Sequence, residues 1–362
     1  MIPQDIMPST FVGSTDKALP WNEIDWLRGL GKNVFFALWL RNPSLSSLDL
    51  PLGHDLYVLT FHYEPFDVAW IMRQINRITA TIIILNDGEF YNFPSRPNVF
   101  LYSYYSWQKH IDQIIEWFPT PSSKNIKYKT SAVCNRITQS KLIVFTALLE
   151  ELGESSCLVK LSDWLEQKNI HYGEKSGNVM LDSLTDIFFN KYFGKLYTVD
   201  NFVNSEHNVQ RINSNPWSIF YTSAALHFTN ESHHYSLMKN NTEDLIYPGP
   251  HMTEKTFKCL IAGVSFIPVA QFNTYENLKR LGLKFDYGLD LTWDQDPGNL
   301  TRLSGIVKLI QTLKDYSVND LIEMTQDSTN HNSHMVWSGD FQKNCRAHNE
   351  NIANEILTKF SK

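Results

Sequence analysis

An acid and a base stand together at the start of a short amphipathic segment, MTEKTFKCLIAG, at residues 252–263. Thr253 is a suitable residue to cap a helix, and the apolar residues after it have helical spacing. Glu254 and Lys255 then fall in the first helical turn, where free N–H groups and the helix dipole attract anions. A lysine there can bind a diphosphate, and a carboxylate can accept hydrogen bonds from sugar or ribose hydroxyls. A surface cap without any ligand would explain the same residues.

Two further segments carry groups that suit the same kind of ligand. The segment 216–232 holds a strand-like run that ends in the polar pair Asn230 and Glu231. Arg136 and Lys141 stand at the opening of an apolar segment with helical spacing. In an open parallel sheet, ligands bind beyond the carboxyl ends of the strands, where the N-termini of the following helices point. The sequence therefore predicts that these groups gather at one edge of a sheet.

The first third of the chain supplies the elements of one such sheet. Runs of β-branched and aromatic residues predict strands at 33–40, 55–64, 80–90 and 98–105. Apolar residues at helical spacing predict helices at 65–78 and 106–118. This alternation of strands and helices predicts a mainly parallel sheet covered by helices.

A linker-like segment rich in proline, serine and lysine, residues 119–129, separates this series from a second one. The second series predicts strands at 130–135, 157–162 and 216–232, and helices at 140–153, 273–283, 299–315 and 344–360. Residues 251–269 predict a helix that ends at the glycine, followed by an apolar strand. The polar segment 163–215 gives no clear element. The predicted domains are residues 1–125, residues 126–335 and a C-terminal helix, 336–362, that packs back on the first domain. The predicted fold is α/β, with two Rossmann-like domains facing a cleft in a GT-B-like layout.

The composition limits the classes of protein that the sequence can encode. With 43% hydrophobic and 19% charged residues among 362, the chain can form a sizeable core. The formal net charge of −6 argues against broad binding to phosphate backbones. The four cysteines form no CxxC pair, which disfavours a zinc site and a disulfide framework. We find no signal peptide and no transmembrane run, so we expect a cytoplasmic protein of a bacterium or of an intracellular virus.

The blocks ALHFTNES and MTEKTFKCLIAGVSFIPV resemble the donor-site signature of the α-1,3-fucosyltransferases and their bacterial and viral relatives. The block SAVCNRITQSKLIVFTALLEEL resembles the strand and helix that bind the donor phosphate in that family. TYENLKRLGLKFDYGLDLTWD resembles the stretch that follows the signature in virus-encoded relatives. The resemblance covers residues 130–315, whereas the N-terminal third matches only in its rhythm of elements. The family's usual Glu-Asn order is reversed here in Asn230-Glu231, and either Arg136 or Lys141 corresponds to its basic residue.

The resemblance implies a glycosyltransferase that moves a sugar from a nucleotide-diphosphate sugar to a hydroxyl acceptor with inversion. Cations and helix dipoles can absorb the charge that builds on the leaving diphosphate without a metal ion. No DxD pair stands at a predicted strand end, and the acids of residues 290–296 are interpreted as loop residues. We therefore expect no metal and no cofactor besides the donor. The donor-binding residues that the resemblance implies are Arg136, Lys141, Asn230, Glu231, Thr253, Glu254 and Lys255.

An inverting transfer needs a carboxylate that removes the proton from the acceptor hydroxyl. Asp87 and Glu89 follow the predicted strand at 80–86, and Glu64 follows the one at 55–61. We expect the base among these three, with Glu89 and Asp87 ahead of Glu64, because the strand before them is the most apolar of its domain. A plain turn at the Asp-Gly pair is the competing interpretation of Asp87.

Two acceptors fit the sequence: a glycan, and a hydroxymethylated base of viral (phage) DNA. Aromatic side chains that could stack on a sugar or a base are Tyr102, Tyr104, Tyr105 and Trp107. A protein of another class also fits, namely a nucleotide- or carbohydrate-binding protein without catalysis on the same frame. Turnover of a nucleotide sugar distinguishes the enzyme from the binding protein.

Overall fold

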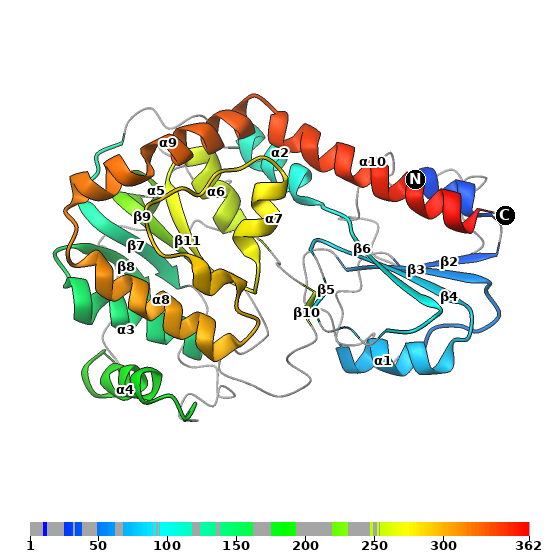
Figure 1. Cartoon of the computed structure of the whole chain (residues 1–362), viewed down its shortest axis with the longest axis horizontal. Coiled ribbons are helices and arrows are strands. Elements are labelled where there is room, and N and C mark those ends of the chain that lie inside the picture. The colour runs from blue at the N-terminus through cyan, green and yellow to red at the C-terminus, as the bar shows by residue number, and fades with distance from the viewer. Residues whose placement is uncertain are drawn as a thin grey trace. The chain divides into compact units, whose positions relative to one another are not determined.

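The computed structural model describes residues 10–12, 25–31, 33–37, 49–61, 68–88, 90–91, 93, 95–117, 124–134, 138–161, 175–192, 219–230, 247–248, 252 and 254–361. The chain has a mixed α/β fold and packs into two units (Figure 1). Unit 1 consists of residues 1–108, 242–251 and 342–362, and unit 2 of residues 109–241 and 252–341. The chain therefore passes between the units after residues 108, 241, 251 and 341.

Unit 1 is built on a five-stranded parallel sheet with the strand order β1-β2-β3-β4-β6. The strands are β1 (Thr10–Val12), β2 (Val34–Ala37), β3 (Leu56–Phe61), β4 (Thr81–Asn86) and β6 (Val99–Ser103). A separate antiparallel pair joins β5 (Phe90–Tyr91) to β10 (Tyr247–Pro248). β4 lies between β3 and β6 and is buried from Ile82 to Asn86, as the run of apolar residues in this segment predicts.

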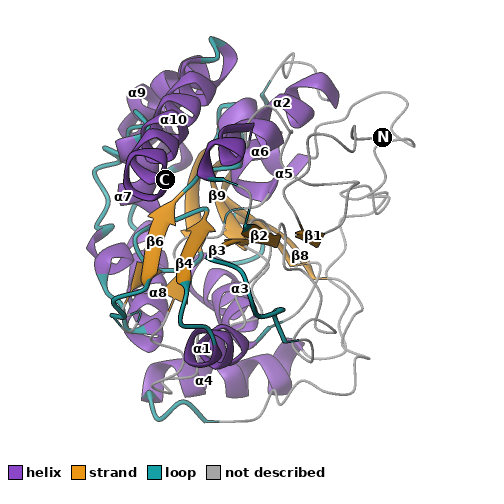
Figure 2. Cartoon of the chain, turned by 90° about the vertical axis from the view of Figure 1, so that its right-hand side faces the viewer, coloured by secondary structure: helices purple, strands orange, loops and turns teal. Residues whose placement is uncertain are grey.

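Both faces of this sheet are apolar and both are covered. Successive strand residues point to opposite faces, so Ile82 and Ile84 pack on one side with α1 (Val68–Arg77). Ile83 and Leu85 pack on the other side with the 3-10 helix η3 (Asp25–Leu30) and with α10 (Asp340–Phe360). α1 and α10 accordingly lie on opposite sides of β4 and β6 in Figure 2.

The order of the strands explains why a helix distant in sequence covers the second face. Strand order follows chain order across the sheet, so every connection steps in the same direction. Crossovers between parallel strands are right-handed in nearly all proteins, and crossovers in one direction place their helices on one face. α1, in the connection from β3 to β4, occupies that face. η3 departs from this pattern, because it lies in the connection from β1 to β2 and packs on the other face together with residues 342–360 of α10.

Asn349 fixes α10 to the end of β6. Its Oδ1 accepts a hydrogen bond from the Tyr105 backbone N–H at 2.8 Å, and its Nδ2 donates to the Tyr105 carbonyl at 2.7 Å. A second contact between the two elements joins the hydroxyl of Tyr102, in β6, to Glu355 of α10. Burial and the neighbouring carboxylate of Glu355 raise the pKa of Tyr102 to about 12. The clamp joins backbone and side chain across 244 positions of sequence.

Unit 2 is built on a four-stranded parallel sheet with the order β11-β9-β7-β8. Its strands are β7 (Tyr128–Cys134), β8 (Cys157–Leu161), β9 (Ala224–Asn230) and β11 (Ser265–Val269). One side carries α3 (Gln139–Leu152), α4 (Val179–Ile187) and α8 (Asn299–Leu313), and the other α5 (Ile219–Thr222), α6 (Glu254–Ala262) and α9 (Val318–Trp337) (Figure 1). The remaining helices are α2 (Trp107–Trp117), the π-helix η6 (Phe188–Tyr192), α7 (Thr274–Arg280) and the 3-10 helix η9 (Thr292–Gln295).

The strand order of unit 2 reverses between β7 and β9. From β7 the chain runs through α3 to β8 on one side, and from β9 it runs through α6 to β11 on the other. Right-handed crossovers in opposite directions place α3 and α6 on opposite faces. α6 ends in a Schellman motif at Gly263, whose φ is 63°, with the Val264 N–H bonded to the Cys259 carbonyl at 2.9 Å. The glycine stop of the predicted helix is therefore confirmed.

The long helix α9 has no counterpart among the predicted helices because few of its buried positions are apolar. Its inward-facing residues include Ser328 and Asn332, which are polar. Ser328 Oγ accepts from the Asp286 N–H at 2.9 Å, and Asn332 bonds to both backbone groups of Lys284. α9 thus holds the loop after α7 through hydrogen bonds, and its one clear sequence signal is the capping box of Ser317 and Asp320.

Replacing Asn349 by alanine should destabilise unit 1 more than an exposed substitution on the same helix. The change leaves the buried N–H and carbonyl of Tyr105 without this partner, at a cost of about 1–3 kcal/mol for each group. Urea-induced unfolding measures the difference. Asn351→Ala is the control, because Asn351 is exposed on α10. Equal stabilities of the two variants would contradict the role given to the clamp.

Candidate functional site

The site lies in unit 2, at the carboxyl ends of β7 and β9. These neighbouring strands end at Cys134 and Asn230, and the helices that follow them, α3 and α6, leave toward opposite faces. The α3 N-terminus is capped by Thr138, whose side chain accepts a hydrogen bond from the Lys141 N–H at 3.4 Å. A reversal of strand order with two helix N-termini beside it is the usual position of a ligand in open α/β sheets.

Four lysines of unit 2 are buried among the described residues. Lys141 lies in the first turn of α3 and is 5% exposed, and Lys255 lies in the first turn of α6 and is 8% exposed. Lys160, one residue before the end of β8, is 6% exposed. Lys258, one turn after Lys255 on α6, is 5% exposed. Lysine is rarely buried to this extent in proteins, and two of the four lie in the first turns of the helices at this edge.

Lys141 and Lys255 place basic side chains in the first turns of the helices that follow β7 and β9. A helix N-terminus already carries a partial positive charge, so basic side chains are unfavourable in a first turn. A ligand with several negative charges close together, such as a diphosphate, suits the arrangement.

Asn230 lies where the sequence predicts it, at the last position of β9. It is 1% exposed, and its Nδ2 donates to the Val133 carbonyl at 3.4 Å. This bond joins the carboxyl ends of β9 and β7. The structure thus brings Lys141, Asn230 and Lys255 to one edge of one sheet, and donor binding by them stays a prediction.

Asp87 lies past the carboxyl end of β4 in unit 1, as predicted, but its carboxylate is engaged in the fold. It is 1% exposed, and its Oδ1 accepts hydrogen bonds from the Ser106 N–H at 2.7 Å and the Ser106 hydroxyl at 2.8 Å. Ser106 directly precedes α2, so Asp87 fixes the start of that helix. The geometry gives Asp87 a positioning role, and its role as a base stays a prediction.

Most of the other predicted site residues lie outside the described part of the chain. Glu254 begins α6, but its side chain is not among those described. The predicted site residues that lie outside the described part of the chain are Glu64, Glu89, Arg136, Glu231 and Thr253.

The acids between residues 290 and 296 have local structural roles. Asp294 is 1% exposed and accepts from the Thr274 N–H at 3.2 Å and the Tyr275 N–H at 2.9 Å, so it caps α7. Asp296 accepts from the Gly298 N–H at 2.7 Å at the start of α8. Within the described residues, no three histidine, cysteine or acidic side chains are grouped as a metal site requires.

A buried serine–histidine pair lies inside the same sheet, and the sequence analysis did not single it out. Ser131 of β7 and His227 of β9 are in register, with Ser131 Oγ 2.8 Å from His227 Nδ1. Ser131 Oγ donates to the Phe220 carbonyl at 2.7 Å, which leaves it to accept from the histidine. A hydroxyl in this state is not activated as a nucleophile. Burial lowers the pKa of His227 to about 3, and the nearby Lys258 adds to the lowering.

No match to a known protein family, to a curated protein or to a solved structure is found for this chain. Among the helices that the structure describes, none has both the length and the apolar composition that crossing a membrane requires.

His227 should make the protein less stable as the pH falls from about 6.5 to about 3. In this range the unfolded chain binds a proton at the imidazole and the folded chain does not, so stability is lost on acidification by up to about 1.4 kcal/mol per pH unit. Urea unfolding at several pH values measures the slope. His227→Asn, which keeps a donor near the Nδ1 position, should flatten it.

The same substitution at His334, which is exposed on α9, is the control and should keep the wild-type slope. A wild-type slope in His227→Asn would show that other groups account for the acid sensitivity.

Proposed function

We propose that the protein is a glycosyltransferase whose unit 2 binds the diphosphate of a nucleotide sugar at the ends of β7 and β9. One observation carries the proposal: Lys141 and Lys255 lie nearly buried in the first turns of the two helices that flank the reversal of strand order. Both lie in the segments that resemble the donor site of the α-1,3-fucosyltransferases and their relatives. A two-domain, GT-B-like arrangement of the units belongs to the same proposal.

The chemistry of sugar transfer explains why cations would be useful at this place. When the glycosidic bond breaks, negative charge grows on the leaving nucleoside diphosphate. Preorganised positive groups in a site that excludes water stabilise this charge more in the transition state than in the bound substrate. Lys141, Lys255 and the two helix N-termini would act in this way. The acceptor contributes the attacking hydroxyl, from either a glycan or a hydroxymethylated DNA base.

A binding protein without catalysis could use the same proposed site. It would bind a nucleoside diphosphate with the same lysines but would release none from a nucleotide sugar. Separate measurements of ligand binding and of turnover distinguish the two functions.

At least one of GDP, UDP, CDP and ADP at millimolar concentration should raise the melting temperature, because a ligand that binds only the folded state stabilises it. Lys141→Met and Lys255→Met should each reduce this ligand-induced shift. Methionine keeps the length of the side chain and removes its charge, and the loss expected for one charged hydrogen bond is about 1.5–3 kcal/mol. The measurement is the difference in melting temperature with and without the nucleotide for each variant.

Lys127→Met is the matched control. Lys127 is exposed and lies one residue before β7, at the amino end of the strand and so at the end opposite the proposed site. Its substitution should preserve the nucleotide shift. If no nucleotide stabilises the wild type, or if all three variants respond alike, the diphosphate site is not at this edge.

Lys255→Ala should lower kcat and raise KM for release of nucleoside diphosphate from the nucleotide sugar. The expected loss in kcat/KM is about 2–4 kcal/mol, the range for removing one electrostatic donor to developing charge. Release is measured with and without saccharide acceptors, in the presence of EDTA. Unchanged kinetics in Lys255→Ala would leave the residue only a structural role in the first turn of α6. Wild-type activity that EDTA abolishes and Mg²⁺ or Mn²⁺ restores would contradict the metal-independent mechanism.

A further inference from the structure

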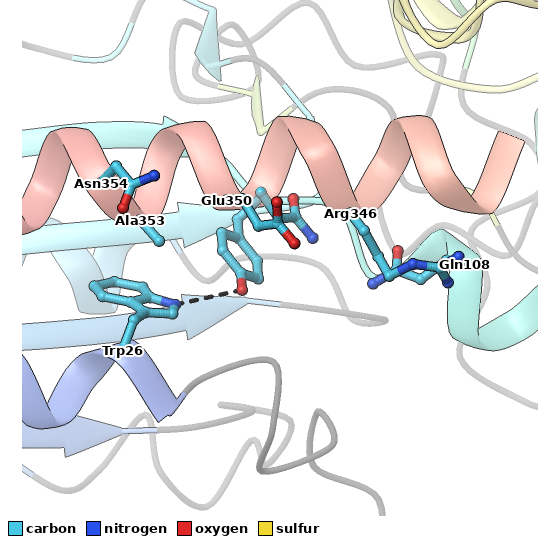
Figure 3. A pocket seen from close by; sticks show the side chains of 8 residues that line it. Trp26, Gln108, Arg346, Glu350, Ala353 and Asn354 are labelled. Carbon is cyan, nitrogen blue, oxygen red and sulfur yellow. Dashed lines mark hydrogen bonds between the residues drawn. The ribbon is translucent and has the colours of Figure 1, made fainter. Parts of the chain in front are cut away.

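A separate candidate site lies wholly within unit 1. It is a pocket with a volume of about 430 Å³ between η3, the end of β6 and α10 (Figure 3). This volume is within the range of pockets that hold small-molecule ligands. The residues that line it are Trp26, Tyr104, Gln108, Arg346, Asn349, Glu350, Ala353 and Asn354.

One wall of the pocket is aromatic and held in place. Trp26 of η3 is partly exposed, and its ring centroid lies 6.3 Å from that of Tyr104 at an interplanar angle of 40°. Trp26 Nε1 donates a hydrogen bond to the Tyr104 hydroxyl at 3.4 Å. Tyr104 is 2% exposed and packs in the core beneath. The indole of Trp26 therefore presents a fixed apolar surface at the pocket. In Figure 3 it lies opposite Ala353 and Asn354.

The opposite wall is a polar stripe of α10. Arg346, Glu350 and Asn354 follow one another at intervals of four residues, which places them on one face of the helix. All three are exposed, whereas Asn349 and Ala353 beside them are buried. In Figure 3 the side chain of Arg346 reaches toward Gln108 at one end of the pocket, and Asn354 lies at the other end. The stripe thus offers a cationic donor, an anionic acceptor and an amide in succession.

These groups favour a neutral ring that carries several hydroxyl groups. An aromatic face packs against the C–H groups of such a ring, while carboxylate, amide and guanidinium groups bond to hydroxyls that both donate and accept. The opposite charges of Arg346 and Glu350 balance each other, which gives no advantage to a simple anion or cation. A purely apolar ligand would leave the polar stripe without its solvent. We propose that this pocket binds a saccharide residue.

Trp26, Asn354 and Glu350 would contact the sugar directly, and Tyr104 would position Trp26. Asn349 would act only through the fold, because its amide is engaged with the Tyr105 backbone. The inference does not rest on the proposed function. A saccharide could bind here whether or not unit 2 transfers a sugar.

The test is the binding of neutral saccharides to the full chain. Saturation-transfer difference NMR detects the binding, and isothermal titration calorimetry measures its affinity. The probes are glucose, galactose, mannose, N-acetylglucosamine and lactose, with glucuronate, glucosamine, glutamate and phenylalanine as charged or zwitterionic comparisons. At least one neutral saccharide should bind, and Trp26→Ala should weaken it about tenfold, the effect of one contact of ordinary strength. Trp26→Phe, which keeps an aromatic face, should retain most of the affinity.

Asn354→Ala and Glu350→Gln test the stripe without disturbing the core, because both residues are exposed. Each should weaken the saccharide severalfold. Asn351→Ala, an exposed substitution on the same helix outside the pocket, should not. Lys255→Met should also leave the saccharide affinity unchanged. The result for the diphosphate site of unit 2 and the result for the saccharide pocket of unit 1 are therefore distinguishable.

The proposal is overturned if no neutral saccharide binds, or if binding is the same in Trp26→Ala, Asn354→Ala and Asn351→Ala. Selective binding of an amino acid, lost in Glu350→Gln, would assign the pocket to a zwitterion and would also overturn it.

Discussion

A parallel strand inside a sheet needs apolar cover on both faces, and the direction of the crossovers decides where that cover comes from. In unit 1 every connection steps the same way, and the local helix α1 covers one face. The second face is covered by η3, from the connection between β1 and β2, and by residues 342–360 of α10. The paired hydrogen bonds between Asn349 and the Tyr105 backbone set the position of α10. The saccharide pocket proposed for unit 1 lies where these covering elements meet.

Unit 2 satisfies the same need in a different way. Its strand order reverses between β7 and β9, so α3 and α6 cover opposite faces and begin at the same end of the sheet. The fold therefore gathers two partial positive charges before any side chain is considered. Lys141 and Lys255 add full charges at the same places. The diphosphate site that we propose would use these positions.

The sequence predicted strands and helices well where burial follows a period. The apolar run of β4 and the glycine that ends α6 are examples, since local pattern and final structure agree. α9 escaped prediction because Ser328 and Asn332 face inward as hydrogen-bonding groups, and polarity there imitates an exposed surface. The engagement of Asp87 with Ser106 could not be read from spacing either, because it depends on how β4 and α2 meet. The spacing of Arg346, Glu350 and Asn354 by four residues can be read from the sequence. The pocket cannot, because it forms only where Trp26 of η3 packs near this face of α10.

The use of α10 as a layer of the first sheet has a consequence during protein synthesis. The partners Tyr105 and Asn349 are 244 positions apart, so at about 5–20 residues per second the ribosome needs roughly 10–50 s to make the second after the first. During that interval the strands of unit 1 have been synthesised, while residues 342–360 that complete their apolar cover have not. The nascent sheet must wait with Val58, Ile83 and Leu85 uncovered by their final partner. Such a chain would be expected to need chaperones while it is being made, and more so for unit 1 than for a domain whose layers are contiguous.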